Sequence, residues 1–331
     1  MKFFSIRLIA LTILCALLTP GSAKAMEPPK KLKDYPRHKI EFVVRWGAGG
    51  AAGAYARHFA KVVNEKLKLN VVAVNMVGAS GMNAINYYME QPADGYYILN
   101  MDSIFLIGSL QGKTKYTLDD FLNICRVQND TAVLFVRPDD KRFPTFEAMV
   151  KWAKENPKKL TIATEGAGAL GDVILAKLEK LAGFTSNHVP FAKFGEKVTN
   201  VIGGHVDILY EEAGDVLPYV KDGKLKPILV FAKKRLTQKP YDITCTGDFG
   251  WDHDMALWRS IAVKKGTPQP RARYLEQVFK YYHETPEGKA FEKELLLDLK
   301  QGFLPWDETE NWIREQYKTY KEIMTGLGII K

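Results

Sequence analysis

Three glycine-rich segments hold the residues of this 331-residue chain whose types and spacing could bind a ligand. They run from Gly47 to Gly53, from Gly78 to Gly81 and from Glu165 to Gly171, each between an apolar run and a helical pattern. Free amides and the dipole at a helix N-terminus bind carboxylate or phosphate without a charged side chain. A glycine lets the ligand come close, because it has no Cβ. Two interpretations stay open: an anion site, or tight turns that only allow close helix–sheet packing.

More specific chemistry finds little support. Gly47-x-Gly49-x-x-Ala52 is a loose dinucleotide fingerprint, but Asn75 stands where an acidic residue is required. The chain has no P-loop lysine, no HExxH and no Gly-x-Ser-x-Gly. Asp252-His253-Asp254 cannot converge on a cation from a strand, so we expect a surface loop there. We expect no catalytic residue, no metal and no cofactor.

Acidic residues follow two of the expected strands. Glu165, Glu211 and Glu212 would repel a second carboxylate of a ligand if they faced it, and would suit an ammonium group or a hydroxyl. Which of them faces inward stays open, and we expect at least two to be solvated.

The first 25 residues have the features of a cleaved secretory signal. Lys2 and Arg7 precede an apolar run from Leu8 to Leu18, and Ala23-Lys24-Ala25 fits a small-x-small cleavage site. The apolar run is shorter than the ~20 residues that span a bilayer. Without this segment the formal net charge falls from +9 to +6. The basic residues are scattered, so no nucleic-acid partner is expected.

The remainder reads as an α/β protein. Strand and helix patterns alternate from Lys39 to about Phe231, which predicts parallel-rich sheets covered on both faces, and three helices follow Pro268. Only Cys125 and Cys245 remain after cleavage, and a disulfide and two buried thiols are both open.

An ordered set of short motifs resembles one known family, the periplasmic solute receptors of tripartite tricarboxylate transporters, also called Bug proteins. The motifs cover nearly the whole mature chain: Tyr35-Pro36, Phe42-Val43-Val44, Ala48-Gly49-Gly50, Asn75-x-x-Gly78-Ala79-Ser80-Gly81, Asp94-Gly95-Tyr96, Leu160–Thr164, His188–Phe191, Ile202–Asp207, Gly223–Pro227, Lys234-Arg235-Leu236 and Gly266-Thr267-Pro268.

The resemblance implies a type II periplasmic binding protein, with two α/β lobes joined by a hinge and a ligand in the cleft between them. Lobe 1 would comprise residues 26–125 and 240–331, and lobe 2 residues 126–239. The turns of lobe 1 would grasp a carboxylate, and lobe 2 would select the rest of the ligand on closure. The implied ligand-binding residues are Trp46, Ala48, Gly49, Ala52, Gly53, Ala79, Ser80, Gly81, Met82, Asp102, Ser103, Thr164, Gly168, Ala169 and Glu211.

The chain departs from the family pattern at three places. Arg45 stands where the family usually has Pro, and Gly53 where it usually has Asp. Arg45 could donate to a ligand carboxylate or point outward into solvent, and we favour the second. The third turn has fewer hydroxyl residues than the family pattern, so relatives do not define its specificity.

We therefore expect a monomeric, periplasmic solute-binding receptor for a small organic carboxylate: a dicarboxylate, an aromatic carboxylate or an amino acid. Its partners would be transporter membrane subunits or a sensor kinase. The alternative is an exported enzyme that acts on a carboxylated small molecule.

Overall fold

The computed structural model describes residues 27–48, 50–165, 168–191 and 193–331. The expected signal segment 1–25 therefore lies outside the described residues. Among the helices that are described, none is both long and apolar enough to cross a membrane.

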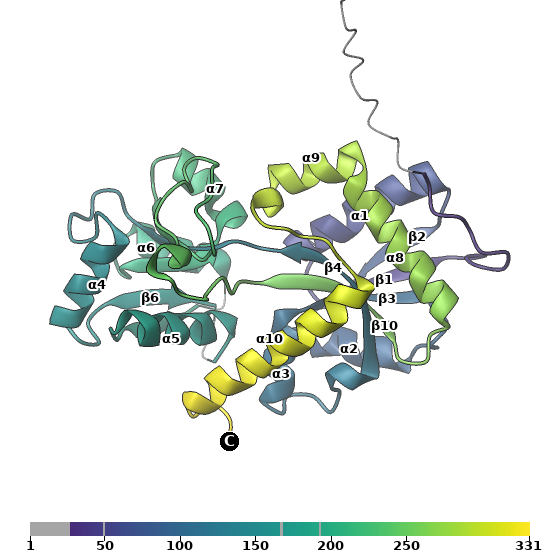
Figure 1. The fold of residues 1–331 in the computed structure, drawn as a ribbon, viewed down its shortest axis with the longest axis horizontal. Coiled ribbons are helices and arrows are strands. Elements are labelled where there is room, and N and C mark those ends of the chain that lie inside the picture. The colour runs from purple at the N-terminus through teal and green to yellow at the C-terminus, as the bar shows by residue number, and fades with distance from the viewer. Residues whose placement is uncertain (1–26, 49, 166–167, 192) are drawn as a thin grey trace, which may run out of the picture.

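The first of two sheets has six strands in the order β11-β4-β10-β3-β1-β2. β1 pairs in parallel with β2 and β3, whereas β10 runs antiparallel to both β3 and β4 (Figure 1). The strands are β1 (Ile40–Val44), β2 (Val71–Asn75), β3 (Tyr97–Asp102), β4 (Phe121–Asn129), β10 (Trp258–Lys264) and β11 (Leu304–Pro305). The expected strands are confirmed, and β4 and β10 are additions that the sequence patterns did not indicate.

Helices cover both faces of this sheet because its strands are apolar on both sides. Alternate residues of β1 show this: Phe42 packs with α1 and α8, and Val43 packs in a second core with α2 and α3. The helices are α1 (Ala51–Leu67), α2 (Met82–Glu90), α3 (Ser103–Leu110), α8 (Gln269–Glu284), α9 (Pro286–Glu294) and α10 (Trp306–Gly326).

The second sheet has five strands in the order β7-β6-β8-β5-β9. β6 is parallel to β7 and β8, and β5 is antiparallel to β8 and β9. The elements are β5 (Ala132–Val136), α4 (Phe146–Glu155), β6 (Thr161–Thr164), α5 (Leu170–Ala182), β7 (Asn187–Pro190), α6 (Phe194–Ile202), β8 (Ile208–Glu212), α7 (Ala213–Lys221) and β9 (Lys226–Val230). The two sheets with their covering helices confirm the expected two-lobed α/β class (Figure 1). The sheets are mixed and not parallel-rich as expected, because β10 and β5 each run antiparallel to both neighbours.

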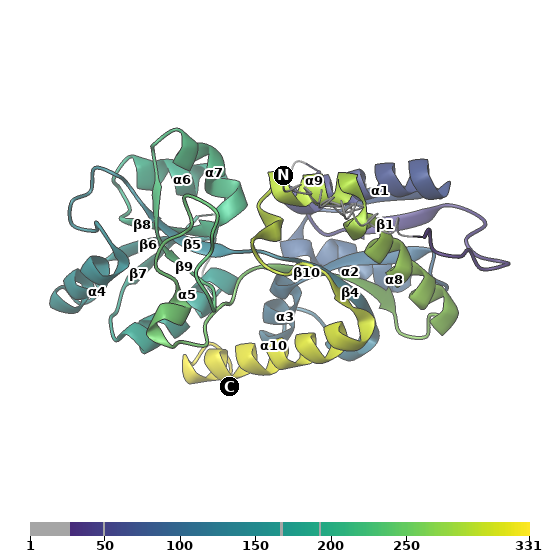
Figure 2. The same ribbon diagram turned by 45° about the horizontal axis from the view of Figure 1, so that its top comes forward.

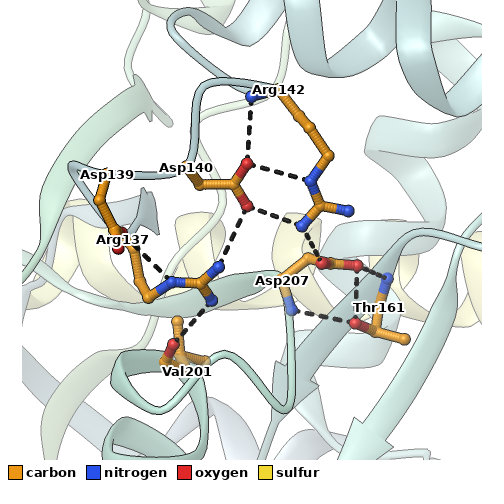
Figure 3. A network of polar contacts seen from close by, with 7 residues as sticks. All are labelled: Arg137, Asp139, Asp140, Arg142, Thr161, Val201 and Asp207. Carbon is orange, nitrogen blue, oxygen red and sulfur yellow. Dashed lines mark hydrogen bonds and ion pairs between the residues drawn. The ribbon is translucent and has the colours of Figure 1, made fainter.

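A network of hydrogen bonds and ion pairs lies at the amino ends of β6 and β8 in the second sheet (Figure 3). The Asp207 carboxylate accepts hydrogen bonds from the Thr161 amide at 3.0 Å and hydroxyl at 2.9 Å, and from Arg142 at 2.6 Å. Arg142 also binds Asp140. The motif residue Asp207 therefore has a structural role, which leaves the carboxyl ends of these strands for ligand binding.

The chain crosses between the sheets twice, where β4 leads to β5 and where the 231–257 segment leads to β10. The crossings are joined by the Asp130 amide, which donates to Leu257 at 2.9 Å, and by an ion pair of Asp130 with Arg259 at 2.9 Å. β4 remains part of the first sheet as far as Asn129, and Cys245 forms an isolated backbone β-bridge with Val230 of β9 in the second sheet. We propose that lobe 2 spans about residues 130–256 instead of 126–239.

The lobes also touch away from the crossings. α10 leaves the first sheet and packs against α3 and against α5 of the second lobe (Figure 2). One apolar core accordingly contains Phe105, Ile174 and Tyr320 together. Cys125 and Cys245 are free, buried thiols in separate cores, which settles the question left open by the sequence.

Candidate functional site

The first glycine-rich turn leads from β1 into the N-terminus of α1. Gly50 is the N-cap residue and makes no side-chain cap, so the first amides of this 17-residue helix have no partner within the helix. Ala52 and Gly53 are buried beneath the turn, and Ala48 is exposed. A Cβ on Gly53 would lie 2.8 Å from the Gly47 and Ala48 carbonyl oxygens, which explains the glycine here. Gly49 lies outside the described residues.

The second turn lies beside the first. The Asn75 side-chain amide donates to the Trp46 carbonyl at 2.8 Å, which joins the two turns. Ala79 and Ser80 are exposed with left-handed φ of 47° and 53°, and Gly81 caps α2 with a φ of 82°. Met82, the first residue of α2, is half-buried. The two turns that precede α1 and α2 therefore lie against each other at the carboxyl ends of β1 and β2.

The Arg45 side chain stabilises the arrangement of these two turns. It is fully buried, and its guanidinium binds the Asp102 carboxylate at 2.5 Å, the Ser80 carbonyl at 3.1 Å and the Gly81 carbonyl at 3.5 Å. The expectation that Arg45 points outward is wrong. A guanidinium at this depth is stable only when it is paired, and its partners come from β3 and the second turn.

Asp102 has the same kind of role. Its Oδ1 accepts from the Phe105 amide at 3.1 Å as the N-cap of α3, and its Oδ2 accepts from the Trp46 indole at 2.6 Å. Because the Arg45 guanidinium also binds Oδ1, both carboxylate oxygens are engaged within the protein. Asp102 and the Trp46 side chain position the turn, while Ser103 is buried with no hydrogen-bond partner for its hydroxyl among the described residues.

Two backbone amides of the third turn donate hydrogen bonds to acidic side chains in or next to the turn. The Gly168 amide donates to Asp172 at 2.7 Å, and the Gly171 amide donates to Glu165 at 2.6 Å. The hypothesis that a third cluster of free amides completes the anion site therefore fails for these two residues. Thr164 is buried and Ala169 is half-buried, while residues 166 and 167 lie outside the described residues.

The third turn nevertheless contacts the first lobe. The Gln111 side-chain amide, at the end of α3, donates to the Gly168 carbonyl at 2.9 Å. This hydrogen bond crosses from one lobe to the other, so the turn takes part in the contact between lobes.

A cavity of about 520 Å³ lies between the lobes. Gly50, Ala51 and Ile104 line it from the first lobe, and the carboxyl ends of β6 and β8 line it from the second. A larger hollow of about 970 Å³ lies between β4, residues 232–236 and α10, and includes no residue of the three turns. The smaller cavity is therefore the candidate binding site, because it joins the α1 N-terminus to the second lobe.

The second-lobe wall of this cavity is acidic. Glu165, Glu211, Glu212 and Asp215 line it, together with one cation, Lys197, whose ammonium binds Glu211 at 2.5 Å. Glu211 is buried and Glu165 and Glu212 are half-buried, so the expectation that at least two of the three glutamates are solvated is wrong.

Burial and mutual repulsion set the protonation of this wall. Asp215 is exposed at the cavity, yet desolvation by the surrounding cleft, followed by the Glu211 charge, raises its pKa to about 6. Burial, followed by the adjacent Glu211, raises the pKa of Glu212 well above its usual value. Burial would also raise the pKa of Glu211, but the neighbouring Glu212 carboxyl and the Lys197 ammonium together lower it.

Several buried hydroxyl groups in or next to β3, β5, β6 and β8 have no hydrogen-bond partner among the described residues. Besides Ser103, they include the hydroxyls of Thr131, Thr164 and Tyr210, which are all buried. Buried polar groups are normally satisfied by protein or water. Each of these hydroxyls therefore has hydrogen-bonding capacity that the described residues do not use.

Of the ligand-binding residues expected from the sequence, Glu211 lines this cavity, the first turn contributes Gly50 and Ala51 instead of the residues named, and the second turn contributes none. The sequence analysis did not indicate the other lining residues, among them Lys197, Tyr210 and Asp215. Glu212 had been noted only as an acidic residue near the pocket. The signal for this group was available, because β8 ends in Tyr210-Glu211-Glu212 beside the parallel strand β6. His253, in contrast, is fully buried and lies 2.9 Å from the Ile174 carbonyl, so the surface-loop interpretation of that residue is wrong.

Two α/β lobes with a cavity between them define the class of periplasmic binding proteins, and comparisons with known proteins agree. The family model described as the tripartite tricarboxylate transporter family receptor matches residues 55–329. The chain belongs to this family.

The chain is similar to the Bordetella pertussis protein BugT, with 24% identity over 309 residues that cover 91% of this chain and 92% of BugT. It is also similar in structure to a TctC solute binding protein from Polaromonas, with a TM-score of 0.76, 25% identity and coverage of 88% of this chain and 99% of that one. The fold further matches Rpa4515 of R. palustris, solved with adipate, with a TM-score of 0.73, 18% identity and coverage of 89% and 99%.

Proposed function

We propose that this protein is an exported, periplasmic receptor that captures a small organic carboxylate between its lobes and presents it to membrane transporter subunits or to a sensor. The observation that carries the proposal is the cavity in which the α1 N-terminus at Gly50 and Ala51 faces the strand ends of the second lobe. A helix N-terminus binds a carboxylate through its free amides. The adipate bound to the R. palustris relative supports this ligand class.

The two lobes would open and close around the crossings at Asp130 and Leu257. In this mechanism the α1 and α2 N-termini bind the ligand carboxylate first. Closure then brings Thr164, Gly168 and Glu211 onto the ligand, and the Gln111–Gly168 hydrogen bond stabilises the closed form. Arg45 and Asp102 keep the two turns in register without touching the ligand.

The direct test is a thermal-shift screen of dicarboxylates, aromatic carboxylates and amino acids, followed by recovery of the best ligand. A ligand at a hundredfold excess over its dissociation constant should stabilise the protein by about 2.7 kcal/mol. It should be recovered chemically unchanged, because a receptor binds without turnover. Formation of a product would instead support the enzyme alternative.

A substitution in the cavity tests the location. Gly50 has an extended φ of −86°, and a Cβ there would lie 3.6 Å from its nearest neighbour, so a side chain is tolerated. Gly50→Phe should fill the cavity and weaken binding at least tenfold while the protein stays folded. Gly326→Phe is the matched control, because a Cβ on this exposed glycine meets nothing within 4 Å. Equal affinity in both variants would show that the ligand binds elsewhere.

A further inference from the structure

Three carboxylates converge on one point of the second-lobe wall. Glu211 and Glu212 end β8, and Asp215 lies in the first turn of α7. One oxygen of each lies within 4.8 Å of the others. The parallel register that pairs Ala163 with Leu209 brings Glu165 beside the same group. A ligand that enters the cavity therefore meets four acidic side chains at this end.

The cations around this group already have partners. The Lys197 ammonium binds Glu211 at 2.5 Å. Arg259 binds Asp130 at 2.9 Å and the Gln128 side chain at 3.1 Å. Within the described part of the chain, no basic side chain forms an ion pair with Glu212 or Asp215 at the 4.0 Å limit. Above its pKa of about 6, Asp215 therefore carries a negative charge at the cavity that no basic side chain in the described part of the chain pairs with.

Tyr210 is an independent sign that a ligand group belongs here. Tyr210 is only 2% exposed and is among the residues that line the same cavity, and its buried hydroxyl has no hydrogen-bond partner among the described residues. A buried hydroxyl is normally hydrogen-bonded to the protein or to a bound group. A donor group placed between this hydroxyl and the carboxylates would satisfy both.

We propose that the receptor selects carboxylates whose far end carries an ammonium group, and that Glu212, Asp215 and Tyr210 bind this ammonium. The inference rests on the proposed function, because it assigns the second end of the same cavity. The ligand carboxylate would bind at the α1 N-terminus, and Phe191, Phe194 and Leu257 would contact the carbon chain between the two charged ends.

At pH 8, where Asp215 is ionised, the charges of the wall disfavour the obvious alternative ligand. A dicarboxylate would place its second carboxylate against four acidic side chains and a single lysine that Glu211 already binds. Like charges in a cleft of low dielectric repel each other strongly. A bound calcium ion would need 6–8 oxygen ligands, and this cluster offers one from each of three carboxylates beside an ammonium.

The pKa directions agree with this assignment. Raised pKa values at Asp215 (about 6) and Glu212 mean that the empty wall holds protons that an ammonium would displace. The charged groups that act on these two carboxyls are Glu211, Asp130, Arg259, Lys197 and Lys300. Amine affinity should therefore rise as the pH increases from 5 to 8, because deprotonated carboxylates bind the cation.

The experiment compares ligands that differ only at the far end. Calorimetry at pH 8 would measure 4-aminobutyrate, 5-aminopentanoate and 6-aminohexanoate against succinate, glutarate and adipate, and 4-(aminomethyl)benzoate against terephthalate. The best amine should bind at least tenfold more tightly than its dicarboxylate partner. Glu212→Gln should remove this preference at least tenfold, while the exposed Glu196→Gln on α6 should not change it.

Each other outcome refutes a different claim. If a dicarboxylate binds more tightly and Glu212→Gln has no effect on the ratio, the ammonium assignment is wrong and the proposed receptor function stands. If no carboxylate of either series binds, and the broader screen is also negative, both proposals fall. If calcium chloride alone stabilises the protein and Asp215→Asn abolishes that effect, the cluster is a metal site and the assignment is overturned.

Discussion

The buried pair of Arg45 and Asp102 offers the sharpest test of how the two turns are held. Both side chains are fully buried, and they contact each other at 2.5 Å. In Arg45→Met, the Asp102 carboxylate keeps the Trp46 and Phe105 donors but loses its only ion-pair partner among the described residues. Removing one member of a buried pair costs about 3–5 kcal/mol, because the other charge stays buried.

The expected loss can be measured in two ways. For a folded region of this size, 4 kcal/mol corresponds to a fall in Tm of roughly 6 °C. Urea unfolding monitored by tryptophan fluorescence gives the free energy directly. Ligand affinity should fall as well, because Arg45 also binds the Ser80 and Gly81 carbonyls.

Two further variants separate the pairing from a general loss of packing. Adding Asp102→Asn to Arg45→Met should restore about 2 kcal/mol, because it removes the unpaired charge. Arg37→Met is the control, since Arg37 and its partner Asp34 are 69% and 60% exposed and an exposed pair contributes about 0–1 kcal/mol. If Arg45→Met costs less than 1 kcal/mol, or if the double variant is no more stable than the single one, the reasoning is refuted.

Two other predictions concern the second lobe and are checked by unfolding experiments. Asp207→Ala should destabilise the protein by about 2–3 kcal/mol, because Arg142 and both donors of Thr161 lose their acceptor; a loss below 0.5 kcal/mol would contradict this. Burial lowers the pKa of His188, but its hydrogen bonds to the Asp172 and Glu179 carboxylates outweigh burial and raise the pKa to about 9, above the unfolded value of 6.5. The stabilisation by His188 should therefore be full below pH 6.5 and lost as the pH rises through 9. The free energy of unfolding of His188→Gln should differ from that of the wild type at pH 6 and converge with it by pH 10. A difference that is constant with pH would refute the assignment.

The residues of the candidate site divide into those that touch the cavity and those that hold its walls. Gly50 and Ala51 reach the cavity directly, as do Glu165 and Glu211. Arg45, Asp102 and Gln111 act through other groups, by binding turns or by joining the lobes. A family motif can therefore mark a structural contact, as Asp207 does at the edge of the second sheet away from the cavity (Figure 3).

Local sequence patterns were sufficient to predict the strand–turn–helix units. β-branched runs, glycines and helical periodicity lie close together in the chain, so β1 with α1 and β2 with α2 were expected within three residues of their observed ends. α3 was missed because Ser103–Leu110 is apolar around most of its surface and has no helical periodicity. β10 pairs with both β3 and β4, and each pairing joins residues more than a hundred positions apart, which no local pattern reveals.

The sequence by itself indicated the family, through an ordered set of motifs, and the resemblance to that family implied the two lobes. The positions of the glycine-rich turns were also predictable, because they depend on neighbouring residues. Only the tertiary structure decided what the charged side chains do. Arg45 is buried because Asp102 lies 57 residues away in the chain but 2.5 Å away in space. The acidic wall faces the cavity because β6 and β8 end side by side there. The energy of a charge depends on its burial and its partners, and both come from contacts between distant parts of the chain.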